Sequence, residues 1–239
     1  MDGFSYYNIF DTKGMEYIVI IAFLLLLIPF WLILNRGDRL RQGVRRALGV
    51  LTAGVLRVPQ GIYHSQNHTW AFLERFGAAR VGLDDLLMRI TGEVELKFMR
   101  QPGETVRKGD LLAEIAQDGR SLKVYTPLSG RIVSRNEAVE SDRMLLGEDP
   151  YGKGWLYRIE PADWKGEVAD CYLAAEANHW LSDEVERYKH FVALNRGGLE
   201  QGSAQPVLQD GGELTPGSLG YLSPEAWSTF QQEFLDRRG

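Results

Sequence analysis

The stretch that decides the fold is VELKFMRQPGETVRKGDLLAEIAQDGRSLKVYTPLSGRIV, residues 94–133. Residues 94–98 alternate between apolar and polar side chains, and residues 111–115 form an apolar run next to turn residues. Such patterns predict short β-strands. The Asp118-Gly119 dipeptide between two runs predicts a hairpin with a type I′ turn, in which both central residues have positive φ. Strands this short bury their apolar faces best in a small sandwich or a flattened barrel.

A β-rich domain extends on both sides of this stretch, from residue 58 to residue 161. Short apolar runs separated by glycine and turn residues continue through it. Residues 162–194 carry a partial helical stripe of apolar side chains and are predicted to form helices packed against the β domain. A second helix is predicted to begin near Ser182, a residue type that caps helices. The expected fold class of this part of the chain is therefore α+β.

Residues 195–239 are predicted to form a linker followed by a terminal helix. Glycine and polar residues dominate 196–206, as in flexible linkers. Ser223 and Pro224 then open a helix as the N-cap and the first helical residue. Three aromatic side chains lie on one face of that helix: Trp227, Phe230 and Phe234. Because so short a helix is unstable alone, this face is either a candidate partner interface or a surface that docks on the chain's own β domain.

An uncharged apolar segment near the N-terminus predicts a membrane span. Residues 17–34 read YIVIIAFLLLLIPFWLIL, and a helix of this length covers about 27 Å, close to the hydrocarbon thickness of a bilayer. A secretory signal peptide is the competing interpretation, but residues 1–16 are acidic and no small-residue cleavage pattern follows. A buried helix of a soluble protein is disfavoured because both faces are apolar. We predict a single transmembrane helix with Trp31 near an interface.

A cluster of arginines follows this segment and predicts its orientation. Residues 35–57 contain six arginines and one aspartate, whereas Lys13 is the single basic residue of residues 1–16. The positive-inside rule therefore places residues 1–16 outside, as a short periplasmic tail, and the C-terminal domain in the cytoplasm, as in a single-pass protein of the bacterial inner membrane. Five arginines are predicted to contact anionic lipid, each contributing about 1 kcal/mol. They are Arg36, Arg39, Arg41, Arg45 and Arg46.

The same segment, residues 35–57, is predicted to form a basic amphipathic helix next to the membrane. Its apolar side chains recur at steps of three and four residues, at Leu40, Val44, Leu48, Leu51 and Val55. Three positions remain open for this apolar stripe. It can lie on the leaflet, against transmembrane helices of a partner, or against the soluble domain of this chain.

Composition and isolated residues exclude several classes of function. A single cysteine, Cys171, allows no internal disulfide, and four scattered histidines do not compose a metal site. The net charge of −5 argues against nucleic acid as a partner. Neither a phosphate-binding loop nor a hydrolase nucleophile motif is found. We therefore expect a non-catalytic protein with no metal, no cofactor and no small-molecule substrate.

An ordered set of motifs between residues 61 and 164 resembles the H protein of the glycine cleavage system, a member of the lipoyl/biotinyl-carrier superfamily. The motifs are His68-Thr69-Trp70, Val81-Gly82-Leu83, Pro102-Gly103-Glu104-Thr105-Val106, Tyr125-Thr126-Pro127-Leu128-Ser129-Gly130 and Asp149-Pro150-Tyr151-Gly152. The resemblance implies a lipoyl-carrier-like flattened β-barrel, a barrel-sandwich hybrid, followed by C-terminal helices. It covers less than half of the chain and does not extend to residues 1–57.

The resemblance fails at the position that carries the cofactor of the family. In the H protein, lipoate is attached to a hairpin-tip lysine six residues before the Tyr-Ser-Pro-type motif. The corresponding residue here is Gly119, six residues before Tyr125. The resemblance therefore implies a carrier fold without its lipoyl lysine and without a cofactor. Lys123 is the nearest amine, and lipoylation at Lys123 is the alternative.

These features together predict a role in protein contact. A shuttling carrier must move among soluble enzymes, whereas this chain is predicted to be tied to a membrane. We predict a non-catalytic accessory or scaffold subunit of an inner-membrane complex, whose partners are integral membrane subunits. The family resemblance favours a respiratory or other electron-transfer complex. The alternatives are a membrane-tethered lipoyl carrier modified at Lys123 and a regulatory module that binds a ligand in the cleft of the barrel.

Overall fold

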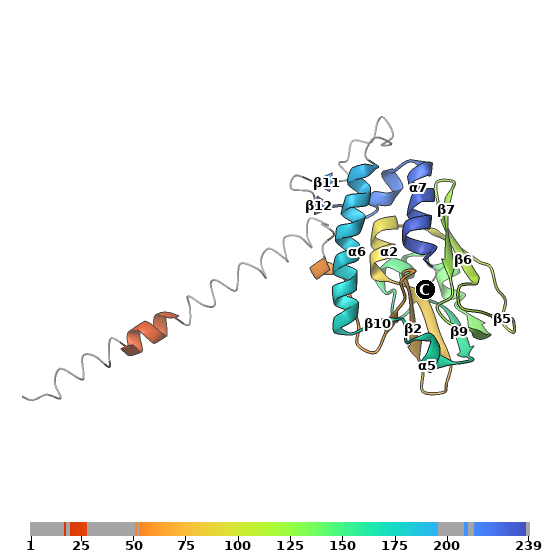
Figure 1. Ribbon diagram of the computed structural model, residues 1–239, viewed down its shortest axis with the longest axis horizontal. Coiled ribbons are helices and arrows are strands. Elements are labelled where there is room, and N and C mark those ends of the chain that lie inside the picture. Colours follow the sequence, from red (N-terminus) through yellow and green to blue (C-terminus); the bar gives the residue numbers. More distant parts are fainter. Residues whose placement is uncertain are drawn as a thin grey trace, which may run out of the picture. The chain divides into compact units, whose positions relative to one another are not determined.

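The computed structural model describes residues 17, 20–27, 51, 53–195, 208–209 and 213–237. The chain divides into two compact units, Met1–Leu48 and Gly49–Gly239. In the first unit, residues 20–27 are helical (Figure 1). Within the described ranges, no helix combines the length and the hydropathy that a membrane crossing requires.

Several predictions fall wholly or partly outside the described residues and stay predictions. They are the tail at 1–16, the span at 17–34 with Trp31, the headgroup contacts Arg36, Arg39, Arg41, Arg45 and Arg46, and the linker at 196–206.

Two antiparallel β-sheets form the framework of the second unit (Figure 1). The larger sheet has the strand order β10-β1-β2-β3-β9-β8-β5, and the smaller sheet has the order β4-β6-β7. The strands of the larger sheet are β1 (Tyr63–His64), β2 (Thr69–Leu73), β3 (Ala79–Leu83), β5 (Thr105–Val106), β8 (Gly130–Arg135), β9 (Trp155–Pro161) and β10 (Tyr172–Leu173). The smaller sheet contains β4 (Glu95–Phe98), β6 (Leu111–Gln117) and β7 (Arg120–Tyr125). Two short strands, β11 (Leu208–Gln209) and β12 (Glu213–Leu214), pair with each other.

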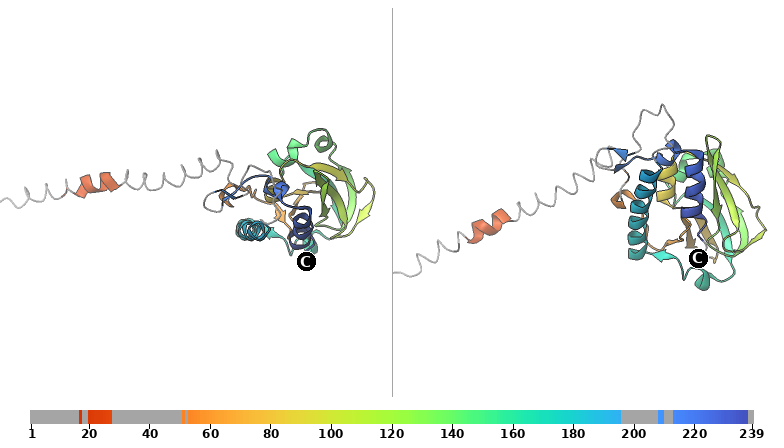
Figure 2. Two further views of the ribbon diagram at one scale, coloured as in Figure 1. Left: turned by 90° about the horizontal axis from the view of Figure 1, so that it is seen from above. Right: turned by 45° about the horizontal axis from the view of Figure 1, so that its top comes forward.

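The helices of this unit are mostly short. They are η1 (Ala53–Val55), α2 (Asp85–Thr91), α3 (Ala138–Ser141), α4 (Met144–Glu148), α5 (Trp164–Glu167), α6 (Ala175–Leu194), η3 (Ser218–Tyr221), α7 (Pro224–Phe230) and the π-helical turn η4 (Gln231–Leu235). The long helix α6 and the terminal helix α7 lie on the same side of the sheets (Figure 2). The predicted α+β architecture with a strand-rich centre and C-terminal helices is therefore confirmed.

One hydrophobic core joins both sheets to the C-terminal helices. Val81 of β3, Leu122 of β7, Tyr188 of α6 and Phe230 of α7 are all buried members of it. Burying a large apolar side chain contributes about 1.5–3 kcal/mol. The residues after the predicted β domain are therefore part of its core rather than an appendage.

The predicted β6–β7 hairpin is confirmed in its detailed geometry. Gln117 pairs with Arg120, so that two residues form the loop. Asp118 has a φ of 49° and Gly119 a φ of 77°. Positive φ at both central residues is the signature of the type I′ turn, whose twist matches that of the flanking strands.

Helix α2 and strand β10 were not predicted, and the β domain does not end at residue 161. The side chain of Asp84 caps α2 by accepting a hydrogen bond from the Leu87 backbone N–H. Nearly every residue of α2 is buried, so its sequence lacks the polar face by which an amphipathic helix is recognised. Strand β10 has only two residues and joins the sheet by pairing with β1, which no local pattern reveals.

The predicted helix break near Ser182 is wrong. Helix α6 continues through this residue, and the Ser182 hydroxyl donates to the Asn178 carbonyl at 2.8 Å. A serine inside a helix can hydrogen-bond through its hydroxyl to a carbonyl of the preceding turn. Ser182 does so and therefore does not cap a new helix.

The predicted amphipathic helix at 35–57 is also wrong at its C-terminal end. Leu51 pairs with Leu214 in an isolated β-bridge, and residues 53–55 form a 3₁₀ turn. Leu51 is buried in the core. Of the three positions left open for the apolar stripe, the structure places Leu51 in the core of the soluble domain. Residues 35–50 lie outside the described residues.

Candidate functional site

The tip of the β6–β7 hairpin is the position where the family resemblance places the cofactor lysine. Gly119 at this tip has no side-chain amine, and a Cβ atom added to it would have no neighbour within 4 Å. The tip therefore faces open space, and its positive φ favours glycine. This geometry suits a tight hairpin closure.

Lys123 lies four residues beyond the tip, on the outer strand of the small sheet. Its side chain is exposed, but its backbone is occupied. The Lys123 N–H donates to Oε1 of Gln231 at 2.7 Å, and Nε2 of Gln231 donates to the Lys123 carbonyl at 3.3 Å. The side-chain amide of Gln231 thus pairs with β7 as the peptide group of a neighbouring strand would. An edge strand of this kind is protected from pairing with another chain.

Arg120 fastens the other end of β7 to the C-terminal segment, which we define as residues 218–237. Its Nη1 atom donates to the Leu222 carbonyl at 2.7 Å, and its guanidinium lies 5.3 Å from the centre of the Trp227 ring. A cation over an indole face adds electrostatic attraction to the hydrogen bond. The C-terminal segment therefore covers the outer strand at Arg120 and at Lys123.

The three aromatic residues proposed as a partner interface lie inside the molecule. Trp227, Phe230 and Phe234 are buried, and the rings of Phe230 and Phe234 stack with centroids 4.5 Å apart. Both phenylalanines also contact Tyr188 and Phe191 of α6. The interface prediction is wrong because this face docks within the chain, the alternative that the sequence left open.

A buried ionic network holds the C-terminal segment at its far end. Nδ1 of His68 lies 2.8 Å from Oδ2 of Asp84, and its Nε2 lies 3.5 Å from Oε2 of Glu184. Burial by itself lowers the pKa of His68, but the nearby carboxylates of Asp84 and Glu184 outweigh it and raise the pKa to about 9. His68 is therefore an imidazolium at neutral pH, between two carboxylates.

Glu184 connects this network to the C-terminal segment. Its Oε1 atom accepts from Nη1 of Arg187 at 2.7 Å and from Nη1 of Arg237 at 3.3 Å. Nearby, Nδ2 of Asn67 donates to the Leu235 carbonyl at 2.6 Å. The turn between β1 and β2, helix α6 and the end of the chain are thus joined by charged or hydrogen-bonded contacts.

Sequence reasoning missed this network. Asp84 and Glu184 are distant in sequence, and no local spacing relates either carboxylate to His68. In the sequence, His68 belongs to one of the family motifs and is one of four scattered histidines. The residue's positive φ of 56°, which turns it inward, is a property of the folded turn.

His64, close to this network, is neutral. Burial lowers its pKa to about 4, with the Asp84 charge acting in the opposite direction. Both of its ring nitrogens are buried without a hydrogen-bond partner. Across the described part of the chain, no three His, Cys, Asp or Glu side chains are grouped so as to hold a metal ion.

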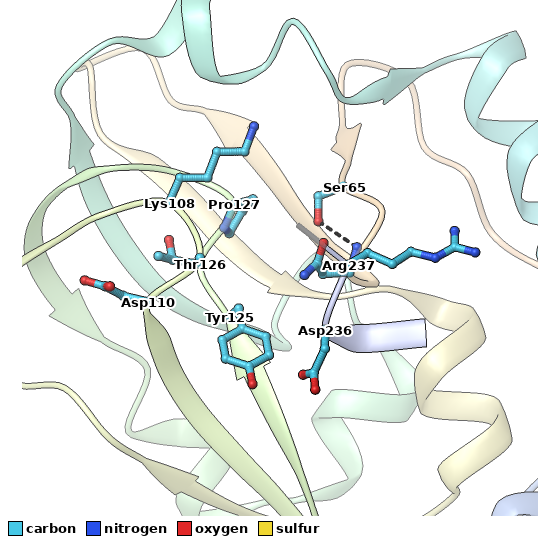
Figure 3. A pocket seen from close by; sticks show the side chains of 10 residues that line it. Ser65, Lys108, Asp110, Tyr125, Thr126, Pro127, Asp236 and Arg237 are labelled. Atoms are coloured by element: carbon cyan, nitrogen blue, oxygen red, sulfur yellow. Dashed lines mark hydrogen bonds between the residues drawn. The ribbon is translucent and has the colours of Figure 1, made fainter. Parts of the chain in front are cut away.

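A cleft of about 710 Å³ lies between the strand end at Tyr125 and the end of the C-terminal segment (Figure 3). Its lining includes Thr126, Lys108 and Arg237. These polar groups already have partners: the Thr126 hydroxyl donates to the Leu128 carbonyl, and Nζ of Lys108 to the Glu167 carbonyl. The cleft therefore presents no set of unsatisfied groups that would identify a ligand.

Comparison with known proteins gives consistent matches to one family. The sequence model described as "Glycine cleavage H-protein" matches residues 62–184. A probable glycine cleavage system H protein of Thermococcus gammatolerans is 32% identical over 128 residues, which are 54% of this chain and 94% of that protein. The glycine cleavage system H protein of Psychrobacter sp. is 36% identical over 104 residues, 44% of this chain and 82% of that protein.

A crystal structure of a glycine cleavage system H protein from Mycobacterium marinum also matches. It has 26% sequence identity, a TM-score of 0.46, and coverage of 53% of this chain and 99% of that chain. The family match includes His68, Asp84, Gly119 and Lys123 but ends at Glu184. The C-terminal segment that covers β7 therefore lies beyond the matched region.

Proposed function

This chain belongs to the glycine cleavage H-protein family, and on that premise we propose that it is a non-lipoylated member that acts through protein contact. We propose further that it is a non-catalytic accessory or scaffold subunit of a bacterial inner-membrane complex. Its H-protein-like domain contacts integral membrane subunits on the cytoplasmic side. A respiratory or other electron-transfer complex is the kind we favour.

The observation that carries this proposal is the state of the β6–β7 hairpin. Attachment of lipoate requires a lysine amine at the tip, and Gly119 supplies none. The residues present therefore do not fit the group that the family carries, and no transfer step is assigned to it. The nearest amine, that of Lys123, lies on a strand whose backbone is bonded to Gln231 rather than at a free apex.

The C-terminal segment supports the same proposal from a different direction. A swinging carrier needs its hairpin to be reached by several enzymes in turn. Here the outer strand of the hairpin is covered by residues that extend the core of the domain, including Trp227 and Phe230. A hairpin integrated in this way is suited to rigid support.

The membrane location is supported by the N-terminal sequence. The apolar stretch at 17–34 followed by the arginines of 35–57 has the composition of a single-pass anchor with its C-terminal side in the cytoplasm. Those arginines are also suited to anionic lipid headgroups. An anchored domain stays beside membrane proteins, and so integral membrane subunits are its natural partners.

The test is affinity capture of the full chain after gentle detergent extraction from native membranes, with mass spectrometry of the intact chain and of everything that elutes with it. The host must be able to lipoylate its own proteins, and its own H protein serves as the positive control. We expect an unmodified chain together with membrane subunits in near-equal amounts. The variant Lys123→Arg should give the same mass pattern apart from the substitution itself.

Two results would overturn the proposal. A lipoyl mass increment that is present on the wild-type chain and absent from Lys123→Arg would establish the alternative, a membrane-tethered carrier modified at Lys123. A chain that leaves the membrane as a lone monomer would remove the scaffold role.

A further inference from the structure

The turn that joins β2 to β3 displays an aromatic side chain to solvent. Phe76 is 100% exposed, more than any other large apolar side chain in the described ranges, and Leu73 of the same hairpin is 39% exposed. In Figure 1 this turn lies at the lower end of the second unit, and β11 and β12 lie at its upper end. A fully exposed phenylalanine contributes nothing to the core, so its position calls for another role.

The turn is held rigidly by its own backbone. The Glu74 N–H donates to the Ala78 carbonyl at 2.8 Å, and the Gly77 N–H donates to the Glu74 carbonyl at 3.0 Å. Gly77 has a φ of 90°, a conformation that glycine adopts at little cost. Phe76 is therefore presented on a preorganised loop, which reduces the entropy lost when a partner binds.

The base of the turn carries an excess of positive charge. Glu74 bridges two arginines, with its Oε1 3.1 Å from Nε of Arg80 and its Oε2 3.2 Å from Nε of Arg158. Arg75, beside Phe76, is exposed. In β9, Glu160 follows residue 159, which pairs with the base of β3. Glu160 already forms an ion pair with Arg131 at 2.8 Å. The tip thus combines three arginines with one glutamate, although the whole chain carries −5.

These arginines are positioned by aromatic side chains. The guanidinium of Arg80 lies 5.2 Å from the centre of the Phe72 ring, and that of Arg158 lies 4.8 Å from the centre of the Trp155 ring. Stacking of this kind holds the long side chains in place. The charge around the tip is therefore as preorganised as the turn itself.

We propose that the β2–β3 turn is a docking knob, in which Phe76 inserts into an apolar pocket with an acidic rim on an integral membrane subunit. This inference rests on the proposed function and names the surface through which the domain makes its contact. Interface hot spots are typically aromatic or arginine side chains that fill well-packed pockets, and the interface rim around them is polar. The positive base of the turn selects a partner pocket with carboxylates around it.

A protein pocket suits this tip better than a lipid surface. Binding to a bilayer surface requires a large buried apolar area in addition to positive charge, and this turn fully exposes a single phenylalanine. So small an apolar surface fills a pocket in a protein but provides little attachment to a bilayer.

The experiment is site-specific photo-crosslinking in the full chain, in native membranes. A photoreactive phenylalanine analogue replaces Phe76 and, in separate control chains, Met144 or Leu194, which are also exposed. We expect position 76 to cross-link to one integral membrane subunit at a yield about tenfold above either control. The cross-linked peptide should contain apolar residues flanked by Asp or Glu, and Arg75→Glu should lower the yield while Arg75→Lys preserves it.

A second measurement uses the captured complex. Phe76→Ala should lower the ratio of partner subunits to this chain about tenfold after washing, whereas Leu194→Ala should leave it unchanged. Cross-links from position 76 to lipid or to a second copy of this chain would overturn the docking knob, as would yields no higher than the controls. An intact complex in those cases would leave the proposed function standing. A lone unmodified monomer would instead remove both.

Discussion

Two hairpins of the second unit, β6–β7 and β2–β3, differ in whether another part of the chain covers them. The outer strand of β6–β7 is covered by the C-terminal segment through Gln231 and the Arg120–Trp227 contact. The turn of β2–β3 ends in Phe76, which is entirely exposed. Buried aromatic side chains of the C-terminal segment lie beside the first hairpin, whereas the turn of the second hairpin exposes an aromatic side chain.

This difference follows the boundary of the family match. The match ends at residue 184, and the C-terminal segment beyond it covers the outer strand of the β6–β7 hairpin but not the β2–β3 turn. The following predictions test whether the two hairpins differ as much in energy as they do in geometry.

The largest effect is expected for Phe230→Ala, which opens a cavity under the covered hairpin. The Phe230 ring is fully buried against Tyr188, Phe191 and Phe234. Removing such a ring costs about 3–5 kcal/mol, so the free energy of unfolding should fall by this amount. Urea unfolding of the purified chain measures it. A loss below about 1 kcal/mol would show that the segment is not part of the core.

The second prediction concerns the pH dependence of the ionic network. The Asp84 and Glu184 charges outweigh burial and raise the pKa of His68 to about 9, above its ordinary value of 6.5. The contribution of the charged His68 side chain to the free energy of unfolding is therefore complete below about pH 6.5. This contribution is lost as the pH rises through about 9. Each unit of pKa corresponds to about 1.4 kcal/mol, which gives a loss of a few kcal/mol.

Urea unfolding at about pH 7 and about pH 10 measures this loss. The wild-type chain should become less stable at the higher pH. The variant His68→Gln should already be less stable at pH 7 and should lose much less on further alkalinisation. His190→Gln, a change at an exposed histidine of α6, is the control and should behave as the wild type. Equal pH dependence in all three chains would contradict an imidazolium at His68.

A smaller effect is expected for Gln231→Ala, which uncovers the edge of β7. This change removes two hydrogen bonds to the Lys123 backbone, each contributing about 1 kcal/mol. Hydrogen exchange should be faster at the Lys123 amide and little changed within β6. Gln232→Ala alters the exposed neighbour and provides the control. Unchanged protection at Lys123 would mean that the segment does not cover the strand in solution.

The smallest effect on stability is expected for Phe76→Ala. Because the ring is fully exposed, the free energy of unfolding should change by less than about 0.5 kcal/mol. Urea unfolding beside Phe230→Ala completes the comparison of the two hairpins. A loss above about 1 kcal/mol would show that Phe76 packs against the domain and is not presented to a partner.

Local patterns were sufficient for the elements that a few neighbouring residues determine. The Asp118-Gly119 dipeptide predicted the type I′ hairpin, because few residues other than glycine, asparagine and aspartate adopt positive φ easily. Ser223 and Pro224 predicted the start of α7, where the Ser223 hydroxyl accepts from the Ala226 N–H. The ordered motifs predicted the family domain.

Long-range contacts could not be predicted in the same way. The break expected at Ser182 is absent because packing along α6 overrides a capping residue. The aromatic face of α7 has the same spacing whether it meets a partner or its own chain. Only its contacts with Phe191 and Tyr188 distinguish the two cases.

The sequence by itself determined the strand-rich domain, its β6–β7 turn with Gly119 at the tip, and the capped terminal helix, because each depends on residues close together in the chain. The tertiary structure alone decided that the terminal helix covers β7, that His68 lies between Asp84 and Glu184, and that the Phe76 side chain is exposed to solvent. Burial and ion pairing depend on which distant segments meet, and hydrophobic periodicity does not specify the partner of an apolar face.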